Sequence, residues 1–288
     1  MILRLDIYKV LYLYPYINIR GIKIILNLKI NFMTTPTELK LKDKQTEILL
    51  NLYRFRFLNR NQIQKLLNHK KHNRIIKWLN ELTKEKYVNC EFERKFGAIP
   101  SVYCLGTKAR KELKKRKYVE EKLLERVYQE KNSSSEFKTH CMAIAEIYLS
   151  LLDLTKKHNA KLIFYTTVDL TDMKYLVLPH PDAYFSIQQK EFTKRYFLDV
   201  FNLNASEKWL FKRVKQYFKY YEEDYWQDHN KNPFPEIIFV CLDEKTKKTL
   251  IKIIKKSLND EENLNFSVTT MENIKSKGIS KDVLYKVE

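Results

Sequence analysis

The sequence predicts an α+β protein in which a basic helical domain precedes a larger domain with a mixed sheet flanked by helices. The chain has 288 residues, which suggests about two domains. Hydrophobic residues make up 44% of it and only 4 residues are glycine, so it can bury real cores. This composition excludes a disordered, collagenous or low-complexity chain. The order of helical and strand-like patterns gives the fold class, and the formal net charge of +19 indicates the partner.

Most of the positive charge lies in one segment. Residues 39–116 hold 21 Lys and Arg against 7 Asp and Glu, a net charge of +14, whereas residues 117–288 hold 28 against 26. A phosphate backbone is bound by positive charge gathered on one compact domain. We therefore expect nucleic acid as the partner, rather than a membrane surface.

Residues 1–38 are expected to form an N-terminal extension outside both domains. Six charged residues, Pro15 and Gly21 interrupt the apolar run of residues 1–32, so neither a transmembrane helix nor a signal peptide fits. Two interpretations stay open: a strand-like extra segment, or an upstream start codon with Met33 as the true start. The polar stretch after Met33 favours the second.

The cysteines and histidines predict no metal site. The 4 cysteines are far apart in the chain and include no C-x-x-C pair, and the 6 histidines form no H-E-x-x-H motif. A disulfide framework is unusual in so large a chain, so we expect buried thiols in a reducing, cytoplasmic protein.

Residues 39–116 carry the pattern of three helices followed by a β-hairpin. Apolar residues recur at helical spacing, Asn59 is placed as an N-cap, and a short polar turn precedes the third helix. The helices are expected over residues 41–53, 60–67 and 72–85, the hairpin strands over 87–92 and 101–105, and a further basic helix over 108–116. Two helices joined by a short turn and followed by a hairpin are typical of a winged helix-turn-helix.

A winged helix with this charge is expected to bind double-stranded DNA. The residues expected on the groove side are Lys70, Lys71, His72, Asn73, Arg74 and Lys77. Asn73 and Arg74 are the expected base readers, because each can form two hydrogen bonds to a base edge. Arg94 and Lys95, in the turn of the hairpin, are expected to contact phosphates. The alternative is a protein-interaction module whose lysines form a solvated face.

The remainder of the chain is expected to contain a linker, an α/β domain and a tail. Residues 117–135 are expected to form a charged helical linker that ends in a serine run, the expected domain boundary. Residues 136–257 predict the order α-β-β-β-α-β-α, a mixed sheet with helices. The strands are expected over residues 161–168, 181–187, 194–200 and 236–242, and the helices over 138–158, 204–226 and 245–256. Residues 258–288 add an edge strand over 265–270 and a tail.

Two aspartates of the predicted sheet are candidates for a metal site. Asp182 begins one strand and Asp199 ends the next, so an antiparallel hairpin would bring their carboxylates together, where they could bind Mg²⁺. This arrangement resembles the nuclease fold whose motif is PD-(D/E)xK, with Asp182 and Asp199 at the acidic positions. Phe201 stands where that motif has lysine. Lys215, or Lys212, on the following helix is the candidate replacement.

The chain also resembles the replication-relaxation family of plasmid and mobile-element proteins. The resembling stretches are residues 41–67, SVYCLGTKAR from Ser101, HCMAIAEIY from His140, Pro181-Asp182-Ala183, Phe197 to Val200, and the helix ending in Tyr220-Tyr221. The resemblance implies a winged helix before a restriction-endonuclease-like domain, and DNA binding in plasmid replication or mobilisation. It also implies a relaxase or a replication initiator as a protein partner. The family pattern has an E-x-D-like acidic pair where this chain has Asp199-Val200-Phe201.

These observations predict a DNA-binding protein of a plasmid or mobile element that acts in replication, relaxation or mobilisation. Its nuclease-like domain is expected to be degenerate, and DNA binding is expected to need no cofactor. One alternative is a Mg²⁺-dependent DNA endonuclease that uses Asp182 and Asp199. Another is a transcriptional repressor whose α/β domain dimerises or senses, and a homodimer stays open under every interpretation.

Overall fold

A computed structural model describes most of the chain from residue 41 onwards. The described residues are 17–19, 22–24, 41–91, 101–117, 119–190, 192–230, 232–258, 264–280 and 282–288. The chain divides into two units, Met1–Lys40 and Leu41–Glu288. In the first unit, β1 (Ile17–Ile19) pairs antiparallel with β2 (Ile22–Ile24). The rest of the expected N-terminal extension lies outside the described residues.

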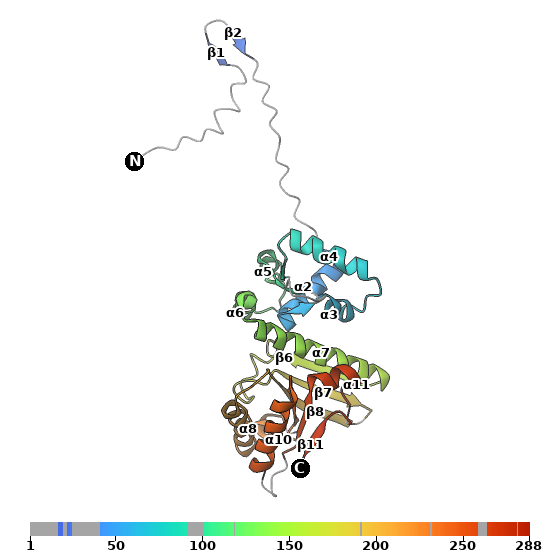
Figure 1. Ribbon diagram of the computed structural model, residues 1–288. Helices are drawn as coiled ribbons and strands as arrows, with labels where there is room; N and C mark the ends of the chain where they lie inside the picture. Colours follow the sequence, from blue (N-terminus) through green and yellow to red (C-terminus); the bar gives the residue numbers. More distant parts are fainter. Residues whose placement is uncertain are drawn as a thin grey trace, which may run out of the picture. The chain divides into compact units, whose positions relative to one another are not determined.

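The second unit begins with helices and a small antiparallel sheet (Figure 1). Its elements are α2 (Asp43–Phe55), β3 (Leu58–Asn59), α3 (Arg60–Leu66), α4 (His72–Lys84), β4 (Val88–Glu91) and β5 (Val102–Leu105). The sheet order is β3-β5-β4, with both pairs antiparallel. The strand β3 was not predicted; the other elements follow the predicted order, and the bounds of these three helices agree with the prediction within two residues.

Local chemistry explains these helices. Ile48, Leu49 and Leu52 form the fully buried stripe of α2, as their helical spacing predicts. Asn59 accepts a hydrogen bond from the Gln62 backbone N–H, 2.9 Å away, and so caps α3. On α4 the buried face includes Trp78, which the apolar spacing used for the prediction did not single out.

The described residues of the segment expected as a linker, which exclude residue 118, are largely helical. The segment contains α6 (Glu121–Gln129) after α5 (Thr107–Leu113), then a 3₁₀ turn η1 (Glu130–Asn132), and it leads into α7 (Ser135–Lys157). Ser134 caps α7 by accepting a hydrogen bond from the Phe137 N–H. Helix α7 contacts α2, α3 and β3 as well as strands of the large sheet. Phe57, Cys104 and Cys141 accordingly share one buried cluster that spans the expected boundary.

The large sheet is mixed, as predicted, and has six described strands in the order β11-β10-β9-β8-β7-β6. Their bounds are β6 (Lys161–Thr166), β7 (Ala183–Gln189), β8 (Phe192–Phe201), β9 (Glu236–Cys241), β10 (Phe266–Thr270) and β11 (Tyr285–Val287). The β8–β9 and β9–β10 pairs are parallel and the others antiparallel. The helices after β8 are α8 (Glu207–Glu222), α9 (Tyr225–Asn230), α10 (Glu244–Ser257) and α11 (Met271–Lys277).

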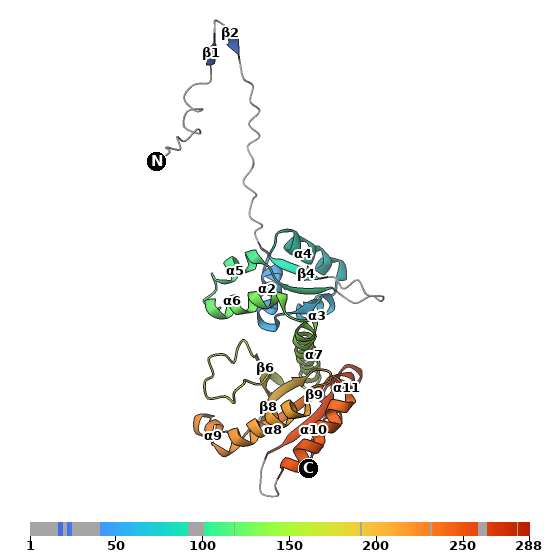
Figure 2. The same cartoon turned by 60° about the vertical axis from the view of Figure 1, so that its left-hand side comes forward.

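Helices cover both faces of this sheet (Figure 2). Phe197, Phe201 and Phe239 pack with α8 and α10 in one large core cluster. Side chains alternate along a strand, so Leu198 and Val200 lie on the opposite face, the side on which α7 contacts β8. No helix that the structure describes is long and apolar enough to cross a membrane.

Two expectations for the second half of the chain are corrected. Residues 258–288 are not an edge strand with a tail, because β10 pairs with strands on both sides and all five of its residues are buried. Its buried Ser267 and Thr269 gave the segment the polar alternation of an edge strand. The helix expected over 204–226 ends at Glu222, and Asp224, with φ of 52°, separates it from α9.

Candidate functional site

The predicted groove-side residues lie together on the turn before α4 and on its first turns. The structure exposes all six of them: Lys70, Lys71, His72, Asn73, Arg74 and Lys77. The opposite side of α4 is anchored by the buried Ile75, Leu79 and Leu82. The helix therefore presents a continuous polar face while its apolar face holds it in the core. Arg94 and Lys95 lie outside the described residues.

Among the described residues of 41–117, some cations form ion pairs with carboxylates, and those on this face do not. Lys44 pairs with Glu47, Lys108 with Glu85 and Arg110 with Glu125, at N–O distances from 2.5 to 2.9 Å. Within the described ranges, Lys70, Lys71, Arg74 and Lys77 have no carboxylate at ion-pair distance. No carboxylate in the described part of the chain therefore neutralises their charge.

The start of α4 adds a partial positive charge to this face. Lys71, the N-cap, makes no side-chain capping hydrogen bond to the first turn. The Arg74 N–H donates to the Lys71 carbonyl at 3.2 Å, so among the described contacts the N–H groups of His72 and Asn73 remain available to an anion, and the helix dipole favours negative charge there. The Arg74 guanidinium lies 5.5 Å from the centre of the Trp78 ring, and this contact orients it along the face.

The two predicted carboxylates also lie together. Asp182 and Asp199 both line an open cavity of about 750 Å³ between α7, α8 and the ends of β7 and β8. Ala183 pairs with Leu198 in the antiparallel register, which places the start of one strand beside the end of the other, as the sequence predicted. The chemical role of the two carboxylates depends on what surrounds them.

Asp182 is held by donors from the protein on both oxygens. Its Oδ2 accepts a hydrogen bond from the Val200 N–H at 2.8 Å, and its Oδ1 lies 2.9 Å from Nε2 of His140. Burial alone would raise the pKa of Asp182, but His140 and the Val200 N–H hold it below its ordinary value. Burial would lower the pKa of His140, and the Asp182 carboxylate reverses this and raises it. The two groups therefore favour a charged pair.

Asp199 is engaged by a buried guanidinium. Arg213 donates from Nε to Oδ2 at 2.8 Å and from Nη2 to Oδ1 at 2.9 Å, and the Tyr217 hydroxyl donates to Oδ2 at 2.8 Å. The Arg213 side chain is only 3% exposed. A bidentate fork of this kind is the strongest common arrangement between arginine and a carboxylate. Burial would lower the pKa of Arg213, and Asp199 raises it above the ordinary value instead.

The structure does not bring Lys215 to this site. Lys215 is exposed, and its ammonium lies over the rings of Phe211 and Phe218. The basic residue beside the carboxylates is Arg213, which sequence reasoning missed. Helical spacing could have found it, because Arg213 falls three residues after Leu210 and four before Tyr217, inside the apolar stripe of α8.

The residues at this site do not fit a Mg²⁺ ion. All four carboxylate oxygens of Asp182 and Asp199 already accept hydrogen bonds, and a guanidinium lies against one of the two groups. Mg²⁺ needs free oxygen ligands, and a fixed cation beside them opposes its binding. Among the described residues, no group of three or more His, Cys, Asp or Glu side chains could hold a metal ion.

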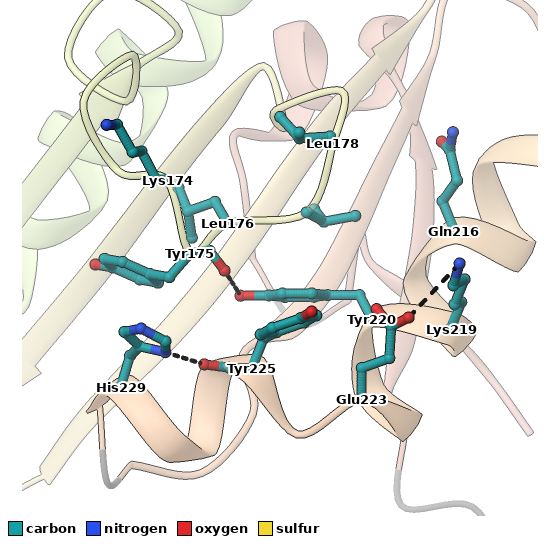
Figure 3. Close-up of a pocket in the computed structure, with 11 residues that line it drawn as sticks. Lys174, Tyr175, Leu176, Leu178, Gln216, Lys219, Tyr220, Glu223, Tyr225 and His229 are labelled. Carbon is teal, nitrogen blue, oxygen red and sulfur yellow. Dashed lines mark hydrogen bonds and ion pairs between the residues drawn. The ribbon is translucent and has the colours of Figure 1, made fainter.

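A second cavity, of about 640 Å³, is lined by aromatic rings of α8, α9 and the loop after β6 (Figure 3). The Tyr220 hydroxyl donates to the Tyr175 carbonyl at 2.9 Å, and the Tyr175 and His229 rings stack with centres 5.2 Å apart. Tyr225 is half-exposed at the mouth. Lys219, also at the rim, pairs with Glu223. These contacts join the loop to the two helices.

The comparison with protein families decides what kind of chain this is. A family model described as replication-relaxation matches residues 49–237, about two thirds of the sequence. The chain belongs to the replication-relaxation family. The match extends from α2 to the start of β9, so it includes the exposed face of α4 and both carboxylates.

Comparison with solved structures finds the restriction endonuclease FokI. One FokI structure is 13% identical with a TM-score of 0.31, and a structure of FokI bound to DNA is 14% identical with a TM-score of 0.29. The matches cover 83% and 80% of this chain, and 45% and 43% of the two FokI chains. This member of the replication-relaxation family therefore spans less than half the length of either structure. No curated protein matches the sequence.

Proposed function

We propose that this replication-relaxation protein binds double-stranded DNA through α4, as a cytoplasmic protein of a plasmid or mobile element. In this proposal α2 to β5 form a winged helix, and α4 enters the major groove. The observation that carries it is the set of four exposed cations that lie together on and before α4, none of which has a described carboxylate at ion-pair distance. Family membership supports a role in replication, relaxation or mobilisation.

The exposed residues of α4 differ in what they offer to DNA. Asn73 and Arg74 can each form two hydrogen bonds to a base edge, so they are the proposed base readers. Lys70, Lys71 and Lys77 supply point charges suited to phosphates, which add affinity without sequence preference. Arg94 and Lys95 are proposed to add further phosphate contacts.

The proposal is tested by substituting Lys71 and Arg74 with alanine in the full chain and measuring duplex binding by fluorescence anisotropy. We expect each variant to weaken binding, and the affinity of the wild type to fall steeply as salt rises. The matched control replaces Lys248 and Lys252 with alanine, since both are exposed lysines of α10. Equal binding by the α4 and α10 variants would overturn the proposal.

We also propose that the restriction-endonuclease-like part of the chain is not catalytic. Arg213 neutralises Asp199, and His140 neutralises Asp182. In this proposal both carboxylates stabilise the fold, whereas the corresponding carboxylates of an active nuclease would bind a metal ion. DNA binding would then need no cofactor. Any strand cleavage in replication or mobilisation would come from a partner such as a relaxase or a replication initiator.

A Mg²⁺-dependent endonuclease is the second candidate, and the shared cavity of Asp182 and Asp199 favours it. Supercoiled plasmid incubated with the protein and Mg²⁺ separates the two functions. We expect no nicking. Nicking by the wild type that is lost in an Asp182→Asn variant, with duplex binding retained, would establish the enzyme and refute the non-catalytic assignment.

A further inference from the structure

A groove begins at the turn before α4 and reaches the large sheet domain. It has a volume of about 670 Å³, and its lining includes His69 and Lys70 from the turn and Lys156 and Lys275 from α7 and α11. An adjoining hollow of about 430 Å³ shares Lys275 and adds Lys157 and Lys277. The two hollows therefore form one surface that continues from the exposed face of α4.

The far end of this surface carries four lysines from two distant parts of the chain. Lys156 and Lys157 end α7, and Lys275 and Lys277 lie in the last turn of α11. Lysines in the last turn of one helix are common, because they offset its dipole. Here two helices end beside the same groove, so their lysines gather in one place.

The convergence is built into the fold. Helix α11 contacts α7, and the Ile279 N–H donates to the Ser150 hydroxyl at 2.9 Å across 129 positions of sequence. Ile274, on the inner side of α11, is 2% exposed and fixes the helix against the core. The four ammonium groups are therefore presented by rigidly packed helices.

The charge of this surface is positive and largely unneutralised. The two hollows are lined by six lysines and two acidic residues, Glu146 and Asp153. Glu146 is engaged by Lys65 at 3.5 Å and by the Gln62 amide at 3.2 Å. In the part of the chain that the structure describes, none of the four lysines of α7 and α11 has a carboxylate at ion-pair distance. Each is exposed.

We infer that the DNA-contacting surface extends from α4 along this groove to the ends of α7 and α11, where the four lysines bind phosphates beyond the segment read by α4. The inference rests on the proposed function of α4. Duplex DNA is the occupant because the groove continues the α4 face and its net charge complements phosphate. The amide side chain of Asn61 lines the same groove, is exposed and can donate to a phosphate oxygen.

The test uses the full chain and compares three variants on duplexes of two lengths. The groove variant carries Lys156→Gln, Lys157→Gln, Lys275→Gln and Lys277→Gln. The matched control carries Lys248→Gln, Lys252→Gln, Lys255→Gln and Lys256→Gln, the same charge change on exposed lysines of α10. The third variant carries Lys71→Gln and Arg74→Gln. Circular dichroism checks that each is folded.

On a duplex of about three turns, roughly 30 base pairs, we expect the groove variant to bind about tenfold more weakly than the α10 control. We also expect the slope of log affinity against log salt to become shallower by about 2 to 4, because each phosphate contact contributes about 0.9. On a duplex of about one turn, the difference between the groove variant and the α10 control should be smaller, because fewer phosphates lie beyond the segment that α4 reads.

The outcomes separate the inference from the function on which it rests. If the α4 variant loses binding and the groove variant matches the α10 control on the long duplex, the groove is not part of the DNA surface and the inference is overturned. The groove would then be open to another partner, such as an acidic protein segment. If the α4 variant binds like the wild type, the proposed function is wrong. The inference about the groove then fails with it, because it assumes that α4 binds DNA.

Discussion

At the scale of single residues, Arg213 decides what the carboxylate site is. Its guanidinium is buried and satisfies both oxygens of Asp199, with Tyr217 completing the network. Removing one partner from a buried ion pair leaves an uncompensated charge away from water. The site therefore depends on Arg213 for its stability, whatever its chemistry.

We predict that Arg213→Met lowers the free energy of unfolding by about 3–5 kcal/mol, because Asp199 would remain buried without its partner. Urea unfolding followed by circular dichroism measures this. The neighbouring Lys212 is exposed, so Lys212→Met should change the free energy by less than about 0.5 kcal/mol. Equal stability of the two variants would contradict the structural role of the pair.

The His140–Asp182 pair gives stability a defined pH dependence. The pKa of His140 is raised above 6.5, so its contribution is fully present below that pH and is lost as pH rises through the folded-state pKa. The pKa of Asp182 is lowered below 3.8, so its contribution is present above that pH and is lost as pH falls through the folded-state pKa.

We predict that the stability difference between the wild type and His140→Gln narrows as pH rises from about 6 to 9, because glutamine keeps a donor but does not titrate. Unfolding free energies measured across this range test it. His158→Gln, at an exposed histidine, is the control and should show a constant difference. A constant difference for His140→Gln as well would show that the pair is not charged.

The sequence predicted which residues lie side by side where the antiparallel pairing of two neighbouring strands determines it. Asp182 and Asp199 had to meet, because one precedes a strand and the other ends the next. Their hydrogen-bond partners were not predictable in the same way. Arg213 comes from a helix and His140 from another, and only the packing of α7 and α8 against the sheet places them at the carboxylates.

At the scale of elements, the N-cap predicted at Asn59 was confirmed, whereas Ser206 caps α8, whose helix was expected to begin at Asn204. Asn59 caps α3 with a reciprocal contact, since the Gln62 side chain accepts from the Asn59 N–H at 3.1 Å. We predict that Asn59→Ala lowers the free energy of unfolding by about 1 kcal/mol, because the first turn of α3 loses its side-chain acceptor. Asn61→Ala, at an exposed position of the same helix, is the control. An effect no larger than that of Asn61→Ala in chemical denaturation would rule out a stabilising cap.

Elements whose burial is decided by distant neighbours were harder to predict. Strand β10 alternates apolar and hydroxyl side chains, which is typical of an exposed edge, yet Ser267 is buried and donates to Glu236 of β9. Its place inside the sheet follows from β11, a short strand with little hydrophobic signal. The break after Glu222 depends on one residue in the left-handed region, Asp224, which composition does not reveal.

At the scale of the whole molecule, net charge located the proposed DNA surface only in part. The segment 39–116 holds most of the excess, and α4 lies within it. The groove adds lysines from α7 and α11, which belong to a stretch whose net charge is only +2. A nearly neutral segment can therefore contribute a basic surface when its fold gathers the cations on one side.

The strands β10 and β11 belong to the large sheet of the unit Leu41–Glu288, and this gives the final prediction. Phe266 and Val268 of β10 pack in the large core with Phe239, so a chain ending at residue 258 would expose that core and the edge of β9. We predict that this shortened chain shows no cooperative thermal unfolding. A chain ending at residue 284, which lacks only the edge strand β11 and the last residue, should fold with a lower midpoint, because Val287 is the one deeply buried residue that it loses. Wild-type unfolding of the chain that ends at residue 258 would show that β10 contributes nothing to the core.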